Sequence, residues 1–200
     1  MIWLVRSMQP RFDLFVWSQI AYLRGLARSK GGNLSLFKDN KIYIKPSGYS
    51  FFDVLPWKIS IIDIDGTLKN SYKPSSEYPM HLEIYRKLPF VKAIFHTHSF
   101  YATLFAFSKN IIPVFTEEAK IYLKEIPLIP FAQPGSSELG KNVVKYLSSN
   151  IQAGILENHG TIVIGKTLKE CYYLSELLEE SAKLAWYLGK YSLNNVDLRS

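Results

Sequence analysis

The sequence predicts an α/β fold in which helices cover the faces of a largely antiparallel sheet. Segments with a helical spacing of apolar residues alternate with short β-branched segments, and tight turns typical of hairpins join several of the latter. The chain of 200 residues is 48% hydrophobic and 20% charged, as in globular proteins. No repeat or linker divides it, so we expect a single domain over residues 1–200.

The N-terminal part is expected to begin with a helix and to continue with strands. Apolar residues recur every three or four positions between Phe12 and Leu26, which is the spacing of an amphipathic helix. Alternating segments around the turns Lys-Asp-Asn and Asp-Gly indicate a hairpin and one further strand. The expected bounds are a helix at 10–28 and strands at 34–37, 41–44 and 58–64.

The second helix is expected to begin at Ser75 or Ser76. Serine is a favourable N-cap residue, and Glu77 suits the positive end of the helix dipole. Pro79 lacks its N–H group in the first turn, where donors have no partner within the helix. Beyond it, strands are expected at 92–97, 112–115, 126–129, 153–157 and 161–164, and helices at 99–108, 135–147 and 167–188.

The net charge of +7 does not by itself indicate nucleic-acid binding. The first hundred residues hold 14 Lys and Arg against 7 Asp and Glu, whereas the second hundred hold 10 of each. The cations are scattered, without a basic run or an interleaved array of aromatic residues. We therefore expect no nucleic-acid partner and interpret the excess charge as a field that attracts a small anionic substrate.

Cellular location is predicted from features that the sequence lacks. No segment approaches the roughly 20 apolar residues needed to cross a bilayer, and the opening residues have no signal-peptide pattern. The single cysteine, Cys171, cannot form an internal disulfide, which suits a reducing compartment. We expect a cytoplasmic protein with no membrane partner.

Three of the four histidines indicate a metal site. His96 and His98 are two apart in an expected strand and so share one face, and His159 lies in a tight turn between two strands. Catalytic zinc sites hold three imidazoles and keep a fourth position open. Zinc is the expected ion, although Mn²⁺, Fe²⁺ or Co²⁺ would accept the same ligands. Glu77 is the natural fourth ligand, with a helix cap as the alternative, and we interpret His81 as structural.

Three turns rich in glycine and serine are candidates for holding a phosphate group. Their backbone N–H groups and hydroxyls are suitable donors to an anion, although each turn alone is equally consistent with an ordinary loop. The turns are Gly31-Gly32-Asn33-Leu34-Ser35, Lys45-Pro46-Ser47-Gly48 and Pro74-Ser75-Ser76-Glu77.

Together with His96-Thr97-His98-Ser99 and Glu157-Asn158-His159-Gly160, and in this order, these segments resemble the class II aldolase/adducin family over about residues 30–185. The resemblance implies a three-layer α/β/α sandwich around a largely antiparallel central sheet, and a homotetramer with active sites between subunits. It implies a metal held by His96, His98, His159 and Glu77, with Glu77 also moving protons. The residues that match its phosphate-binding loops are Gly32, Asn33, Ser47, Gly48, Ser75 and Ser76.

The resemblance implies a metal-dependent lyase. A phosphorylated ketose similar to fuculose 1-phosphate would be cleaved to dihydroxyacetone phosphate and an aldehyde through a metal-stabilised enediolate. The alternatives are a methylthioribulose 1-phosphate dehydratase and an adducin-like interaction module without catalysis. Residues 112–118 lack the tyrosine that family aldolases supply from a neighbouring subunit. Glu117 or Glu118 is the candidate for a second acid/base there, with Glu117 the first choice and a solvated acid at a helix start the alternative.

Overall fold

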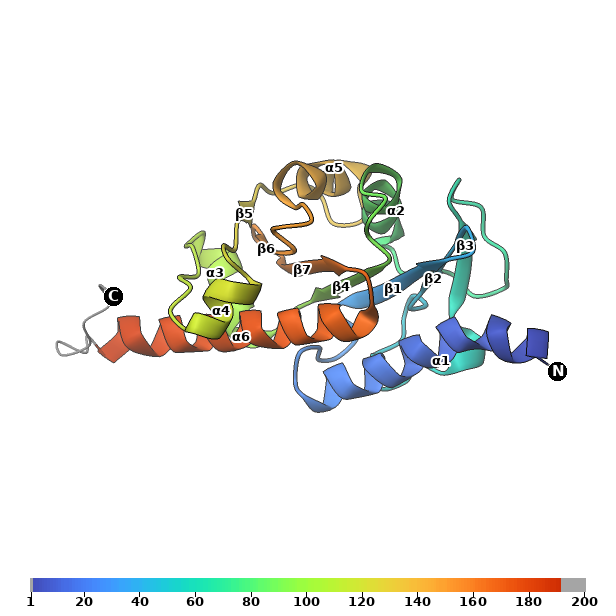
Figure 1. Ribbon diagram of the computed structural model, residues 1–200, viewed down its shortest axis with the longest axis horizontal. Coiled ribbons are helices and arrows are strands. Elements are labelled where there is room, and N and C mark those ends of the chain that lie inside the picture. The colour runs from blue at the N-terminus through green and yellow to red at the C-terminus, as the bar shows by residue number, and fades with distance from the viewer. Residues whose placement is uncertain (1, 192–200) are drawn as a thin grey trace.

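Strands from the whole chain form one sheet, and helices cover both of its faces (Figure 1). A computed structural model describes residues 2–191, with side chains from residue 9 to residue 189. Within these residues, none of the helices is both long and apolar enough to cross a bilayer. The strands are β1 (Asn33–Lys38), β2 (Lys41–Ile44), β3 (Ser60–Asp63), β4 (Ala93–Thr97), β5 (Leu128–Ile129), β6 (Ala153–Leu156) and β7 (Gly160–Gly165). The helices are α1 (Ile2–Leu23), the short 3₁₀ helix η1 (Pro56–Lys58), α2 (Tyr78–Lys87), α3 (Phe100–Ser108), α4 (Glu117–Tyr122), α5 (Ser137–Tyr146) and α6 (Leu168–Tyr191).

The sheet is antiparallel except at one edge, which confirms the expected pairing. The strand order is β3-β2-β1-β4-β7-β6-β5, and only β5 and β6 run parallel. β4 lies in the middle, where Asn33 of β1 is opposite His96 on one side and Ile162 of β7 on the other. The strand that carries His96 is therefore held by hydrogen bonds along both of its edges.

Two layers of helices enclose the sheet. α2 and α5 lie on one face, and α1, α3, α4 and α6 lie on the other (Figure 1). Successive residues of β4 belong to opposite layers, because Ile94 packs with the α2 side and Phe95 with the α6 side. Both side chains are fully buried. Because both faces of the sheet are covered, the sequences of the central strands are continuously apolar rather than alternating. The three-layer α/β/α sandwich is thus confirmed.

Some of the expected elements are wrong. Residues 112–115 form no strand. Ile112 is 1% exposed but the next three residues are partly exposed, and Pro113 has no N–H group for a ladder. It leads instead into α4, which begins at Glu117 as the helix-start alternative for this acid assumed. Its N-cap, Thr116, accepts a hydrogen bond from the backbone of Ala119. The first helix begins earlier than expected and ends at Leu23 rather than near residue 28.

The start of α2 also differs from the expectation. The helix begins at Tyr78, so Glu77, rather than Ser75 or Ser76, occupies the N-cap position. Pro79 lies in the first turn as expected. The Glu77 side chain makes no capping hydrogen bond, although the residue occupies the N-cap position and its acid lies at the positive end of the helix dipole. The carboxylate is left to interact elsewhere.

Candidate active site

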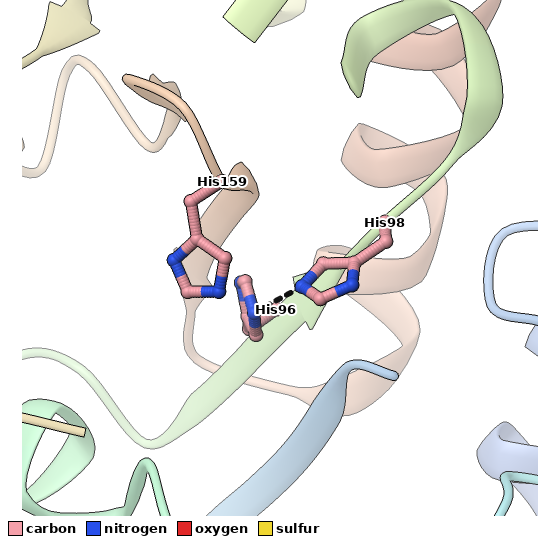
Figure 2. Close-up of side chains that lie close together, drawn as sticks. All are labelled: His96, His98 and His159. Carbon is pink, nitrogen blue, oxygen red and sulfur yellow. Dashed lines mark hydrogen bonds between the residues drawn. The ribbon is translucent and has the colours of Figure 1, made fainter. Parts of the chain in front are cut away.

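Three histidine side chains converge beside the central strand (Figure 2). His96 belongs to β4, His98 follows it directly, and His159 lies in the turn between β6 and β7. The ring centroids are 4.6 to 5.1 Å apart, and one nitrogen from each ring lies within 4.8 Å of the others. Three imidazoles at these separations can coordinate one metal ion.

The Glu77 carboxylate completes this cluster. Its Oε2 lies 3.0 Å from Nε2 of His96, and its Oε1 lies 3.0 Å from Nε2 of His159. The Asn33 side chain donates a hydrogen bond to Oε2 at 2.7 Å. Burial raises the pKa of Glu77, but the neighbouring His96 and His159 outweigh burial and hold the pKa well below its ordinary value. Glu77 is therefore ionised at neutral pH and can accept a proton or bind a cation.

His96 presents Nε2 to the cluster. Its Nδ1 lies 2.8 Å from the carbonyl oxygen of Thr161, and a carbonyl can only accept, so Nδ1 carries a proton. Nε2 lies 2.9 Å from Nε2 of His98 (Figure 2). Burial lowers the pKa of His96, but Glu77 outweighs burial and raises it. Burial, followed by the charges of His96 and His159, lowers the pKa of His98 to about 3, so the His98 ring is neutral.

This donor set fits a divalent cation. Imidazole nitrogens and carboxylate oxygens approach each other at 2.9 to 3.0 Å. Four ligands arranged tetrahedrally around zinc, about 2.0 Å from the ion, lie about 3.3 Å from one another. The three contacts of 2.9 to 3.0 Å are close to this spacing, whereas the nitrogens of the three rings lie within 4.8 Å of one another and would move closer around a shared ion. The imidazole nitrogens and the carboxylate can direct lone pairs at the same point, where they could coordinate one cation together.

The first glycine-rich turn lies against the histidine cluster. Gly32 has φ +72°, and a Cβ atom at this position would lie 2.8 Å from the carbonyl oxygen of His96. Asn33, which follows, is 1% exposed and directs its amide to Glu77. In this structure the Asn33 side chain therefore orients the carboxylate of Glu77.

The other two turns lie side by side. Pro46 and Pro74 form an isolated antiparallel bridge, and the backbone N–H of Ser47 donates to the carbonyl of Lys73 at 2.9 Å. Gly48 is exposed, and no atom lies within 4 Å of the place where its Cβ would be. The two turns thus form a common rim that opens at Gly48.

The two serines of the third turn differ in their surroundings. Ser75 is 7% exposed, and its Oγ lies 3.4 Å from the backbone N of Glu77, from which it accepts a hydrogen bond. Ser76 is exposed. Ser75 supports the segment that carries Glu77, and Ser76 faces outward.

Glu117 lies outside this cluster. Its side chain is 81% exposed and pairs with Lys120 at 2.7 Å, one turn further along α4. Glu118 lines a separate hollow with Arg24 and Tyr122. None of the interactions described for residues 9–189 joins either acid to the histidines.

The structure also reveals site residues that sequence analysis missed. Lys45 is 2% exposed, and its ammonium donates to the carbonyls of Lys30 and Tyr49. Burial lowers the pKa of Lys45 to about 8. Its position next to Pro46-Ser47-Gly48 could have suggested a role at the site. Lysine side chains are usually exposed, however, and nothing in the sequence indicates that this one is buried.

A hydrogen bond links Ser35 of β1 to His81 of α2. His81 is fully buried, which agrees with its interpretation as a structural residue. In the sequence, the feature that could have pointed to Ser35 is its position two residues after Asn33, which puts both residues on the same face of the strand.

Comparison with known proteins gives the same family that the motifs indicate. The family model described as Class II Aldolase and Adducin N-terminal domain matches residues 13–186. An L-fuculose phosphate aldolase of Methanococcus vannielii is 41% identical over 165 residues, which are 82% of this chain and 89% of that protein. A 3-oxo-tetronate 4-phosphate decarboxylase of Escherichia coli K12 is 34% identical over 174 residues, which are 84% of this chain and 82% of that protein.

Solved structures agree with these relatives. YgbL of Escherichia coli, described as an aldolase, epimerase or decarboxylase, is 30% identical and has a TM-score of 0.85, with 92% of this chain and 91% of that chain covered. An L-fuculose 1-phosphate aldolase is 29% identical and has a TM-score of 0.84, with 94% and 89% covered. The family model spans most of the chain, and the folds superimpose over nearly their whole length. The chain belongs to the class II aldolase and adducin family.

Proposed function

We propose that this protein is a zinc-dependent lyase that cleaves a phosphorylated ketose similar to fuculose 1-phosphate into dihydroxyacetone phosphate and an aldehyde. The observation that carries the proposal is the cluster of His96, His98 and His159. The carboxylate of Glu77 lies 3.0 Å from two of these rings, His96 and His159. The relatives named L-fuculose phosphate aldolase support the choice of substrate class. An adducin-like module without catalysis would have no use for such a cluster of buried donors.

The histidines would hold the metal, with Glu77 as a further ligand before substrate arrives. A bound zinc ion would act as a Lewis acid and neutralise the charge that develops on the substrate oxygens when the carbon–carbon bond breaks. His96 is suited to its part because Thr161 fixes the proton on Nδ1 and leaves Nε2 to the metal. His98 is suited because its neutral ring keeps its lone pair available.

Glu77 would supply the proton at the carbon atom from which the aldehyde departs. Bond cleavage leaves an electron pair on that carbon, and the hydroxyl group that becomes the aldehyde loses a proton. Glu77 is ionised before substrate binds, so it would first take up a proton, namely the one that the substrate hydroxyl loses, relayed by the second acid/base. It would then donate this proton to the carbon. Asn33 holds one carboxylate oxygen and so orients the side chain for this transfer.

The hydroxyl proton requires a second acid/base, and Glu117 remains our candidate. This residue is exposed on α4 and is not joined to the histidines within one chain. We therefore propose that it acts on the site of a neighbouring copy in a homotetramer. The exposed apolar residues Ile111 and Trp186 line a hollow between α3 and α6, and Phe107 of α3 is also exposed, which supports an interface at these helices.

The phosphate group would be held by the three turns, through Gly32, Asn33, Ser47, Gly48, Ser75 and Ser76. The bridge between Pro46 and Pro74 supports this arrangement, because it brings the second and third turns together. Gly48 leaves open space at the rim, where Lys30 and Lys58 line the same hollow. These lysines would attract a dianion, while the turns supply neutral donors. Cytoplasmic location remains part of the proposal.

A decarboxylase acting on a 3-oxo-tetronate 4-phosphate is the second candidate. The relatives with that name are 34% identical and cover 84% of this chain. Decarboxylation also breaks a carbon–carbon bond beside a carbonyl group and leaves negative charge on the same kind of oxygen, so one metal centre could serve either reaction. The two reactions differ in the leaving group, which is carbon dioxide in one case and an aldehyde in the other.

One experiment distinguishes these functions. The zinc-loaded protein is incubated with fuculose 1-phosphate and, separately, with a 3-oxo-tetronate 4-phosphate, and dihydroxyacetone phosphate and carbon dioxide are measured in both. We expect dihydroxyacetone phosphate from the first substrate, and a Glu77→Gln variant that keeps zinc but loses turnover by at least about 100-fold. Carbon dioxide release from the second substrate alone would favour the decarboxylase. Near-normal turnover by Glu77→Gln would contradict the role of Glu77.

A further inference from the structure

A second polar group lies next to Glu77, buried between β1 and α2. The hydroxyl of Ser35 is 2.7 Å from Nδ1 of His81 and 2.7 Å from the hydroxyl of Tyr85. Ser35 and His81 have no exposed surface, and Tyr85 is 4% exposed. Apolar side chains of both elements surround this group, as do those of the neighbouring strands. We call these three residues the Ser35 network.

The Ser35 network is in register with the contact that orients Glu77. Asn33 and Ser35 are two apart on β1 and so lie on one face of the strand. Glu77, His81 and Tyr85 are spaced by four residues and so lie along one face of α2 and its N-cap. Two successive polar contacts therefore join the strand to the helix, the first at Glu77 and the second at His81 and Tyr85.

We propose that Ser35, His81 and Tyr85 are positioning residues that hold α2 in register with β1 and thereby place the Glu77 carboxylate against His96. The inference deepens the proposed function and rests on it. β1 is the common reference for both groups, because Asn33 lies opposite His96 in the sheet and also binds Glu77. A shift of α2 along β1 would break the Ser35 network and move Glu77 away from the histidines.

Apolar packing alone would not define this register. Met80 and Ile84 of α2 are fully buried, but apolar contacts have little directional preference. Hydrogen bonds weaken steeply when their distance or angle departs from the ideal, so the two bonds of Ser35 select one position of the helix. The network therefore supplies the directional constraint that the apolar contacts of the same helix lack.

His81 carries a burial penalty that an apolar residue would avoid. Its Nε2 is buried and has no hydrogen-bond partner among the described residues. Its Nδ1 bond to Ser35 is therefore the interaction that offsets this penalty. Burial also lowers the pKa of His81 to about 3, so the ring is neutral. The network thus acts on Glu77 through its position, since it adds no charge beside it.

The test measures metal affinity as well as turnover. Zinc affinity is determined by competition with a chromophoric chelator, and kcat and KM are measured on the ketose 1-phosphate. We expect Ser35→Ala and His81→Leu each to weaken zinc binding about tenfold and to lower kcat about tenfold, with KM changed less than twofold. His81→Asn, whose amide can replace Nδ1 as a partner of Ser35, should recover most of both losses. Tyr85→Phe should lower both quantities about threefold.

Ile84→Val is the matched control on the same helix. It removes one buried methylene, so it should lower the melting temperature while zinc affinity and kcat stay at wild-type values. If Ser35→Ala and Tyr85→Phe behave in the same way, the network is merely structural and the inference is overturned. Both variants keep the shape of the core, so they carry the test even if His81→Leu does not fold.

The zinc measurement separates this inference from the proposed function. If the wild-type protein cleaves neither substrate but Ser35→Ala and His81→Leu still weaken zinc binding, the positioning role stands and the proposed function fails. If the wild type cleaves the ketose 1-phosphate and these variants match it in zinc affinity and kcat, the proposed function stands and the positioning role fails.

Discussion

The histidine cluster and the rim formed at Gly48 are built in different ways. In the cluster, His96 is fully buried and interacts with Glu77 at 3.0 Å and with His98 at 2.9 Å. At the rim, Gly48 and Ser76 are exposed, and the space next to Gly48 is open. The first region is organised by contacts among its own side chains. The second offers a surface whose contacts we expect a ligand to complete.

This difference decides which changes are costly for folding. A buried carboxylate requires compensating partners, and Glu77 has them in Asn33, His96 and His159. Removing one of these partners leaves charge uncompensated in the interior. Removing an exposed donor at the rim leaves no such charge, so its effect should appear in substrate binding rather than in stability.

The largest effect is expected from His96→Ala. The variant should lose its zinc and at least about 1,000-fold in kcat, and should also be destabilised by about 3–5 kcal/mol because Glu77 loses its buried partner. Metal content per chain, measured by atomic emission, and denaturant unfolding check the two parts. Ser76→Ala, at the exposed rim, is the control and should retain its zinc. One zinc ion per chain in purified His96→Ala would refute the metal site.

A pair of glycine substitutions compares the two regions directly. Gly32 and Gly48 both have positive φ, so alanine at either position should cost about 1–2 kcal/mol through backbone strain. Only at Gly32 would the new Cβ lie 2.8 Å from a backbone oxygen, that of His96. We expect Gly32→Ala to lose about 3 kcal/mol or more in unfolding free energy and Gly48→Ala about 1 kcal/mol. Equal losses in urea titrations would contradict the difference between the regions.

The burial of Lys45, beside the rim, predicts a specific pH dependence of stability. Its pKa is lowered by burial from 10.5 to about 8. Between these values the unfolded chain retains a proton that the folded protein has lost, so this residue should raise stability as pH rises from about 8 to 10.5. Its unfavourable contribution is full below pH 8 and amounts to about 3 kcal/mol.

Comparison with Lys45→Met isolates this contribution, because the other titrating groups are common to both proteins. The difference in unfolding free energy between the two proteins is measured from pH 7 to pH 10. It should shift in favour of the wild type as pH rises. A difference that does not change across this range would show that the Lys45 ammonium is not penalised by burial.

The smallest effect is expected from Ser75→Ala combined with Ser76→Ala. Loss of phosphate donors should lower kcat/KM for a ketose 1-phosphate about tenfold, or about 1.4 kcal/mol in transition-state stabilisation, because binding energy at the phosphate also positions the reacting carbon. Zinc content should not change. Inhibition by inorganic phosphate should weaken in the double variant. Equal turnover of phosphorylated and unphosphorylated sugar by the wild type would show that these turns do not bind phosphate.

Features that depend on local spacing could be predicted from the sequence. Residues two apart in a strand share a face, so His96 and His98 could be assigned to one side before the fold was known. Apolar periodicity located most helices and strands, and the order of the five motifs identified the family. The roles of Gly32, Asn33, Ser47, Gly48, Ser75 and Ser76 in phosphate binding stay predictions.

Contacts between residues far apart in the chain could not be predicted in this way. Asn33 binds Glu77 across 44 positions of the chain, and Ser35 binds His81 across 46, so no local pattern reveals either contact. No local pattern reveals the burial of Lys45 either, because lysine side chains are usually exposed. Residues 112–115 have strand-like composition but form no strand, because strand formation requires a neighbouring edge to pair with and the packing of the helical layer provides none.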